Sequence, residues 1–261
     1  KKYKKHKPWL SPIDTFLKHN SQKLETPLSI NERSFQIFSK EKALKEDKGL
    51  ATVLKFNPGL TEVLNYYHTP EPFFTYNITN SNSNNCNCGK NSNIGNIKHE
   101  FNAELQGFNI LIIENKDTWY TLKNIMSPNR NCLEGIKIDS LIYGEGKKIA
   151  RKMDNLTEFD KSYFKAVKTS YYYFGDLDYE GIRIFHDLVN VNPMLEIKLM
   201  KALYIAMLSA AQGIKLPVTK EKQNRNAAEV DWFISFFDVE HQWIIKNILE
   251  CDRYIPQEIL N

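Results

Sequence analysis

The pattern of apolar and polar positions changes character near residue 107. From there on, short apolar runs alternate with segments of helical periodicity, and this alternation is typical of parallel strands joined by helices. Strands are predicted at 109–113, 140–143 and 171–175, with helices after them at 118–126, 147–156 and 180–189. We therefore expect an α/β fold, a Rossmann-like parallel sheet with flanking helices, whose ligands bind at the carboxyl ends of the strands.

The segments on either side of this region have different patterns. Helical spacing from residue 31 and an apolar run at 73–78 predict a smaller α+β module over 31–106. Residues 1–30 carry three prolines and are expected to form a loose arm or the tail of a missing upstream region. The domain over 107–261 is predicted to close with helices at 195–211, 226–237 and 239–250.

An Asn- and Ser-rich stretch at 79–96 interrupts the smaller module. Its composition cannot bury enough apolar surface to offset the entropy of ordering it. We therefore expect a flexible hairpin loop, with a strand returning at 97–101. Cys86 and Cys88 lie in this loop. Because they lack a second ligand pair, they fit neither a structural zinc site nor a disulfide framework, and reduced thiols are expected.

Composition and charge narrow the class of protein. Hydrophobic residues make up 42% of the 261 residues and charged residues 25%, as in soluble globular proteins. The formal net charge of +4 permits nucleic-acid binding without requiring it. No run approaches the roughly 20 apolar residues of a membrane helix, and no apolar stretch of a signal peptide follows the basic N-terminus. We expect a cytoplasmic protein with no membrane association.

Carboxylates follow two of the predicted strands. Glu114 comes directly after 109–113, and Asp176 and Asp178 come after 171–175, with Glu180 two residues further on. Side chains at positions i and i+2 of an extended chain point the same way. A cluster of carboxylates is unfavourable unless a cation neutralises it, and Mg²⁺ binds carboxylates, waters and substrate phosphates. The pattern therefore predicts a divalent-metal site that acts on phosphodiesters.

The acids also have simpler interpretations. An Asp that follows a strand is often the N-cap of the next helix, which applies to Asp176 and Asp178. Glu180, in the first turn of a predicted helix, can be stabilised by the helix dipole alone. Both interpretations stay open beside the metal site.

Three lysines lie close to the predicted strand ends. Lys116 follows Glu114, and Lys147 and Lys148 follow the Gly-rich turn at 144–146. Backbone N–H groups at a helix N-terminus can hold an anion there, so these lysines are candidates for contact with DNA phosphates. A solvated surface is the alternative for all three.

Three motifs resemble a known domain. IIENK at 112–116, YGEG at 143–146 and GDLDYEG at 175–181 are similar to the Toprim domain, the metal-binding fold of topoisomerases, bacterial primases and the overcoming-lysogenization-defect nucleases. Topoisomerases often carry a third Asp where this chain has Glu180. Two further segments, RSFQIF at 33–38 and YIPQE at 254–258, resemble the C-terminal domain of the Wadjet nuclease subunit JetD.

The resemblance implies a fold and an activity. A winged-helix-like module would precede the Toprim domain, as in the A subunit of type IIB topoisomerases. The chain would be a Mg²⁺- or Mn²⁺-dependent DNA endonuclease of a Wadjet anti-plasmid system, cutting double-stranded plasmid DNA presented by an SMC-type, condensin-like complex. Asp176 and Asp178 would hold the metal, Glu114 would bind it or act as general acid or base, and Glu180 would be a further ligand. Because two active sites must face two strands, a homodimer is expected.

Other functions compete with hydrolysis. A topoisomerase-like transesterase would need a nucleophilic tyrosine on the upstream module, where Tyr66, Tyr67 and Tyr76 are found. A Toprim domain can also serve as a non-catalytic DNA-binding or assembly module. RNA processing is a third possibility, because the residues by themselves do not separate DNA from RNA.

Overall fold

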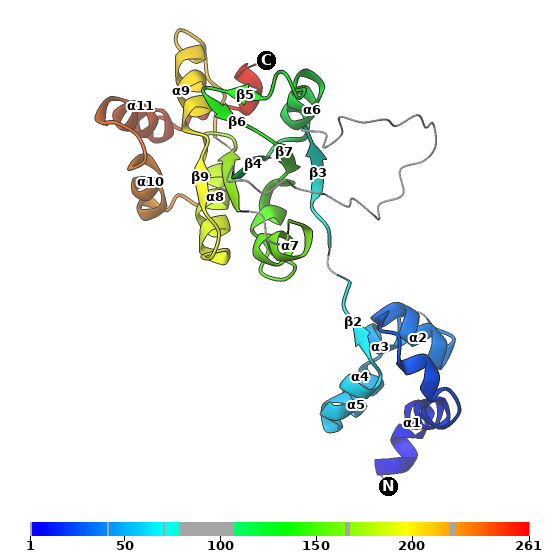
Figure 1. Ribbon diagram of the computed structural model, residues 1–261. Coiled ribbons are helices and arrows are strands. Elements are labelled where there is room, and N and C mark those ends of the chain that lie inside the picture. The colour runs from blue at the N-terminus through cyan, green and yellow to red at the C-terminus, as the bar shows by residue number, and fades with distance from the viewer. Residues whose placement is uncertain are drawn as a thin grey trace. The chain divides into compact units, whose positions relative to one another are not determined.

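The computed structural model describes residues 2–40, 42–69, 71–78, 107–164, 168–219 and 223–260. The chain divides into two compact units, residues 1–71 (unit 1) and 72–261 (unit 2), which Figure 1 shows in ribbon form. The Asn-rich stretch at 79–96, with Cys86 and Cys88, and the strand expected at 97–101 lie outside the described residues.

Unit 1 is a helical unit with its own apolar core. Its core side chains come from four helices and from the residue that follows a fifth, and they are Ile13, Ile30, Leu44, Leu50, Val53 and Leu64. The elements are α1 (Lys2–His19), η1 (Ser21–Leu24), β1 (Leu28–Ser29), α2 (Ile30–Phe38), α3 (Ala43–Glu46), α4 (Lys48–Phe56), α5 (Pro58–Val63) and β2 (Tyr66–Tyr67). The short strands β1 and β2 pair in parallel.

Residues 2–19 are helical, where the sequence predicts a loose arm. Helix α1 contains Pro8 and Pro12, and a proline inside a helix removes a hydrogen bond and crowds the preceding turn. The helix forms nevertheless because its apolar side is buried: Ile13 and Phe16 are 3% and 5% exposed. Trp9 lies against Gly49 of α4, where any side chain would overlap the indole ring. Tertiary packing thus outweighs the local effect of the prolines.

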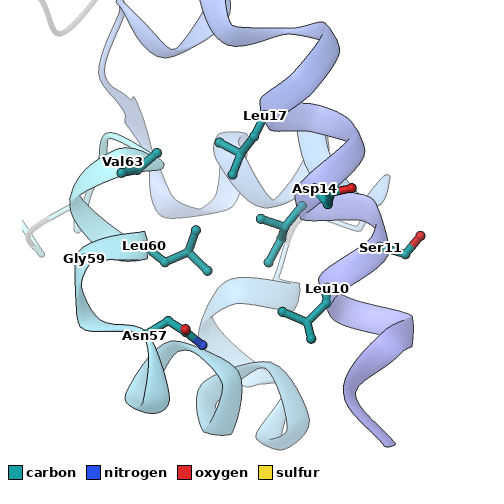
Figure 2. Close-up of a pocket in the computed structure, with 9 residues that line it drawn as sticks. Leu10, Ser11, Asp14, Leu17, Asn57, Gly59, Leu60 and Val63 are labelled. Carbon is teal, nitrogen blue, oxygen red and sulfur yellow. The ribbon is translucent and has the colours of Figure 1, made fainter. Parts of the chain in front are cut away.

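A hollow of about 710 Å³ lies between α1 and α5 in unit 1, and Figure 2 shows its lining side chains. The wall is mostly apolar, with Leu10, Leu17, Leu60 and Val63 among its residues. Its one carboxylate, Asp14, accepts a hydrogen bond from Lys18. The hollow therefore lacks the acidic grouping that the sequence predicts for a metal site.

Unit 2 is built on a five-stranded sheet with the order β3-β7-β4-β8-β9. Strands β7, β4, β8 and β9 run parallel, and β3 runs antiparallel to β7 at the edge. Residues 110–113 of the central strand are all fully buried. Since successive side chains of a strand point to opposite faces, both faces of this sheet are covered, as in α/β proteins. The α/β class is confirmed.

Unit 2 contains the remaining elements, most of which Figure 1 labels. They are β3 (Phe74–Asn77), β4 (Phe108–Ile113), α6 (Lys116–Ile125), β5 (Cys132–Leu133), β6 (Ile136–Lys137), β7 (Ser140–Tyr143), η2 (Gly146–Ala150), α7 (Leu156–Tyr163), β8 (Thr169–Phe174), α8 (Tyr179–Val191), β9 (Ile197–Leu199), α9 (Lys201–Ala210), α10 (Ala227–Ile234), α11 (Val239–Glu250) and η3 (Gln257–Leu260). No helix in the described parts is long and apolar enough to cross a membrane.

Several predicted boundaries differ from the observed ones. The unit boundary falls at 71/72 and not at 106/107, because β3 pairs with β7 and so belongs to the sheet of unit 2. The helix predicted at 147–156 is the short η2 followed by a turn, and α7 starts only at residue 156, where the Asn155 side chain caps it by accepting from the Glu158 backbone N–H. The helix predicted at 195–211 is split into β9 and α9.

Candidate functional site

The ends of β4 and β8 bring the predicted acids to one edge of the sheet. The two strands pair in parallel, with Ile113 opposite Phe174. The next residue on β4 is Glu114, whose backbone N–H donates to the carbonyl oxygen of Phe174 over 3.0 Å. Glu114 therefore lies beside the turn that carries Asp176, as the strand pattern predicts.

Two glycines make room for this arrangement. A Cβ atom at Gly175 would overlap the Glu114 carboxylate and the Tyr173 hydroxyl. A Cβ atom at Gly181 would overlap the carbonyl oxygen of Asp176. The two glycines of the GDLDYEG motif are thus needed because backbone and carboxylate approach each other closely here.

Glu114 is held in a setting that disfavours its charge. Its Oε2 accepts a hydrogen bond of 2.8 Å from the hydroxyl of Tyr173, a residue with no exposed surface. Burial, with the negative charges of Asp176 and Asp178 nearby, raises the pKa of Glu114 to about 8, although the Tyr173 hydrogen bond acts in the opposite direction. A proton or a cation is therefore needed to neutralise this carboxylate near neutral pH.

Asp176 accepts hydrogen bonds from two residues outside the GDLDYEG motif. Its Oδ1 accepts hydrogen bonds from the Asn115 side-chain amide over 3.0 Å and from the Gln257 backbone N–H over 2.8 Å. In the described parts of the chain, Oδ2 has no hydrogen-bond partner. Burial, together with the charges of Asp178 and Glu258, raises the pKa of Asp176 to about 6. Asp176 therefore also favours a positive neighbour.

Gln257 joins the two strand ends, a role that the strand pattern does not indicate. Its side chain accepts from the Asn115 backbone N–H over 2.9 Å and donates to the Phe174 carbonyl oxygen over 2.9 Å. The residue is fully buried. Gln257 lies in the YIPQE segment that resembles the JetD domain, and this resemblance is the one signal in the sequence that could have found it.

Asp178 caps the helix that follows it. Its Oδ1 accepts from the Gly181 backbone N–H over 2.6 Å at the start of α8, so the N-cap interpretation is confirmed for this residue. Its Oδ2 accepts from the side-chain amide of Gln223 over 2.6 Å. The side chain is only 7% exposed, and both of its oxygens are thus held by the protein.

The carboxylates of the site are suitable ligands for a hard divalent cation, but their side chains are not arranged around a common point. Among the residues that the structure describes, no three His, Cys, Asp or Glu side chains are grouped closely enough to hold a metal ion as they stand. The acids are nevertheless the ligand type that Mg²⁺ prefers. Two of them, Glu114 and Asp176, have pKa values raised partly by neighbouring negative charge, which a bound cation would offset.

Three of the four remaining candidates are engaged in ion pairs. Glu180 pairs with Lys147 over 2.6 Å, and Lys148 pairs with Glu145. Lys147 also lines a recess of about 120 Å³ between η2 and α8. Contact of Lys147 or Lys148 with a phosphate would require these pairs to open. Lys116 is exposed at the first position of α6 and remains a candidate for phosphate contact.

The tyrosines of the transesterase alternative are divided between the two units. Tyr66 and Tyr67 form β2 of unit 1. Tyr76 lies on β3 in the sheet of unit 2, where its ring packs edge-on against Trp119 with centroids 6.5 Å apart. Tyr76 therefore does not belong to the upstream unit, contrary to the prediction.

Comparison with protein families decides the relationship. The family model of the Wadjet protein JetD, C-terminal, matches residues 84–250 of the 261. The chain belongs to the JetD C-terminal family. The match includes the ends of β4 and β8 with their three acids, and the expected membership of the JetD C-terminal family is confirmed; the segments at 33–38 and 254–258 lie outside the matched residues. A comparison with curated proteins gives no match.

Proposed function

We propose that this JetD-family chain is a Mg²⁺-dependent DNA endonuclease subunit of a Wadjet-type defence system, with a Toprim-like metal site. The observation that carries the proposal is the convergence of Glu114, Asp176 and Asp178 at the carboxyl ends of two adjacent parallel strands. Burial and mutual repulsion favour a cation at this edge. Membership of the JetD C-terminal family supports the link to plasmid defence.

The proposal assigns a role to each residue of the site. A bound divalent cation would polarise a phosphoryl oxygen and activate water. Asp176, with Oδ2 open, and Asp178 would hold the cation. Glu114 would bind the cation directly or act as general acid or base, exchanging a proton with the attacking water or the leaving oxygen. The Tyr173 hydroxyl orients this carboxyl group through Oε2.

Binding of DNA at the carboxyl edge of the sheet would involve a lysine and partner proteins. Lys116, the first residue of α6, is the exposed cation next to the acids in sequence and would contact a phosphate. An SMC-type complex would present double-stranded plasmid DNA. A twofold homodimer would place one site on each strand of the duplex.

Cleavage of supercoiled plasmid tests the proposal. The wild-type chain, Asp176→Asn and Asp187→Asn are incubated with Mg²⁺ or Mn²⁺ and with EDTA, alone and with the SMC-type complex. Asp187 is a matched control because it is an Asp on α8 outside the acid group. We expect metal-dependent cutting by wild type and Asp187→Asn, and at least a 100-fold loss in Asp176→Asn, as when a key transition-state contact is removed. Equal cutting by all three would refute the assignment of the site.

A non-catalytic assembly module is the second candidate. It is favoured by the saturation of Asp178, whose two oxygens are held by Gly181 and Gln223, and by the lack of a ready metal-binding group among described residues. A module of this kind would bind DNA or partners equally well in wild type and Asp176→Asn, with no cleavage in either. Titration with Mn²⁺ separates the two candidates, since the nuclease must bind the cation.

A further inference from the structure

One side chain from a distant part of the sequence holds the second oxygen of Asp178. The Gln223 side-chain amide donates from Nε2 to Oδ2 over 2.6 Å, while the Gly181 backbone N–H donates to Oδ1 over 2.6 Å. Two donors on the two oxygens fix both the position and the plane of the carboxylate. Gln223 is 45 residues from Asp178 along the chain, so the contact is made by the fold and not by the local motif.

Two described residues near Gln223, Arg225 and Thr219, make contacts with other parts of unit 2. Arg225 pairs with Asp252 over 2.7 Å, and its guanidinium lies 5.6 Å from the ring centroid of Tyr179, the residue after Asp178. On the other side, the Thr219 backbone N–H donates to the carbonyl oxygen of Asp252 over 2.9 Å. The contacts of Arg225, two residues after Gln223, with Tyr179 and Asp252 favour the placement of the amide beside Asp178.

The amide has one orientation that suits this neighbour. Turning it over would place its carbonyl oxygen against a carboxylate oxygen, which is repulsive, so Nε2 must face Asp178. Oε1 is buried and has no hydrogen-bond partner among the described residues. The hydrogen bond to Asp178 is therefore the one side-chain hydrogen bond that the described residues give this amide.

We propose that Gln223 is a positioning residue of the candidate metal site: it orients Asp178 through Oδ2, so that this carboxylate can bind the cation. A carboxylate oxygen has two lone pairs, so the amide N–H and a cation can share Oδ2. Partners that orient a metal ligand in this way typically change metal affinity 10- to 100-fold when they are removed. This inference rests on the proposed function, since it requires that the acid group bind a divalent cation.

A Mn²⁺ titration of the metal-free chain, followed by electron paramagnetic resonance, tests the proposal. The proteins are wild type, Gln223→Met and Gln242→Met. Methionine keeps the length of the side chain and removes the donor and the acceptor. Gln242 is a matched control because its amide also donates to a single oxygen, the carbonyl of Phe237 over 2.7 Å, on α11. We expect Mn²⁺ to bind about 10- to 100-fold more weakly to Gln223→Met, and with unchanged affinity to Gln242→Met.

A second variant keeps the test decisive if Gln223→Met folds poorly. Gln223→Glu places a carboxylate against Asp178, so the metal-free protein should lose thermal stability and Mn²⁺ should restore it. The rise in melting temperature on adding Mn²⁺ is therefore expected to be larger than in wild type. A merely structural role would lower the melting temperature of both variants and leave the effect of Mn²⁺ unchanged.

The outcomes separate this inference from the proposed function. If wild type binds Mn²⁺ and both Gln223 variants respond to it as wild type does, the role of Gln223 is overturned and the metal site stands. If wild type binds no Mn²⁺, the metal site and the role of Gln223 fall together. Weaker binding by Gln223→Met with normal binding by Gln242→Met supports both.

Discussion

Replacing Glu114 by Gln should remove most of the pH dependence of stability in the metal-free protein between pH 5 and pH 8. The pKa of Glu114 is about 8 in the folded chain, against a reference value of 4.5. Between these two values the folded protein binds a proton that the unfolded chain releases. Stability is therefore fully present at low pH and is lost as the pH rises towards 8. Gln is neutral at every pH and nearly isosteric, so it removes this contribution.

The size of the effect follows from the two pKa values. Each pH unit within the window between the unfolded and folded pKa changes the unfolding free energy by about 1.4 kcal/mol. From pH 5 to pH 8, Glu114 accounts for a loss on the order of 3 kcal/mol in wild type. Asp176, with a pKa of about 6, adds about 1 kcal/mol over the lower part of this range. Glu114→Gln should retain only this smaller part.

Urea unfolding in EDTA at pH 5, 6.5 and 8 measures the prediction. The control is Glu240→Gln on α11, an exposed Glu in the first turn of its helix, which should follow wild type. At pH 8, a divalent cation at 100 times its dissociation constant should restore about 2.7 kcal/mol to wild type and much less to Glu114→Gln. Equal slopes of stability against pH in wild type and Glu114→Gln would refute the argument that burial and neighbouring charge raise this pKa.

Three further substitutions test the residues that surround Glu114, Asp176 and Asp178. Gly181→Ala should destabilise the chain by more than about 1 kcal/mol in urea unfolding, because its Cβ overlaps a carbonyl oxygen, whereas Gly59→Ala, with open space, should be nearly neutral. Tyr173→Phe should shift the midpoint of Mn²⁺ binding to higher pH, because the Tyr173 hydroxyl lowers the pKa of Glu114. Tyr171→Phe on the same strand should cause no such shift. An equal shift in both variants would contradict this role of Tyr173. Gln257→Ala should cost about 2 to 4 kcal/mol through three lost or weakened hydrogen bonds, and an unchanged urea midpoint would count against that role.

The central strands and the position of the acids follow from the sequence by itself. Runs such as 109–113 are apolar on every residue but the first, which is typical of a strand buried on both faces. Parallel pairing places the carboxyl ends of such strands together, so the approach of Glu114 to the Asp176 turn is predictable from local patterns. The glycines in the same turn are likewise part of a local motif.

Other parts of the fold depend on contacts that no local pattern contains. Strand β9 is too short to separate from the helical pattern around it, and it becomes visible only through its pairing with β8. Helix α1 forms in spite of its prolines because its apolar side packs against the rest of unit 1. In both cases tertiary packing overrides the local preference.

The sequence by itself determines which acids reach the edge of the sheet, and only the tertiary structure decides their chemical state. Gln223 and Gln257 come from 45 and 81 residues away to hold Asp178 and Asp176. The raised pKa of Glu114 arises from burial and from the charges of Asp176 and Asp178, which follow another strand. Hydrogen bonds and desolvation of this kind exist only once distant segments are packed together, which is why residue type and spacing predict the place of the site but not the properties of its carboxylates.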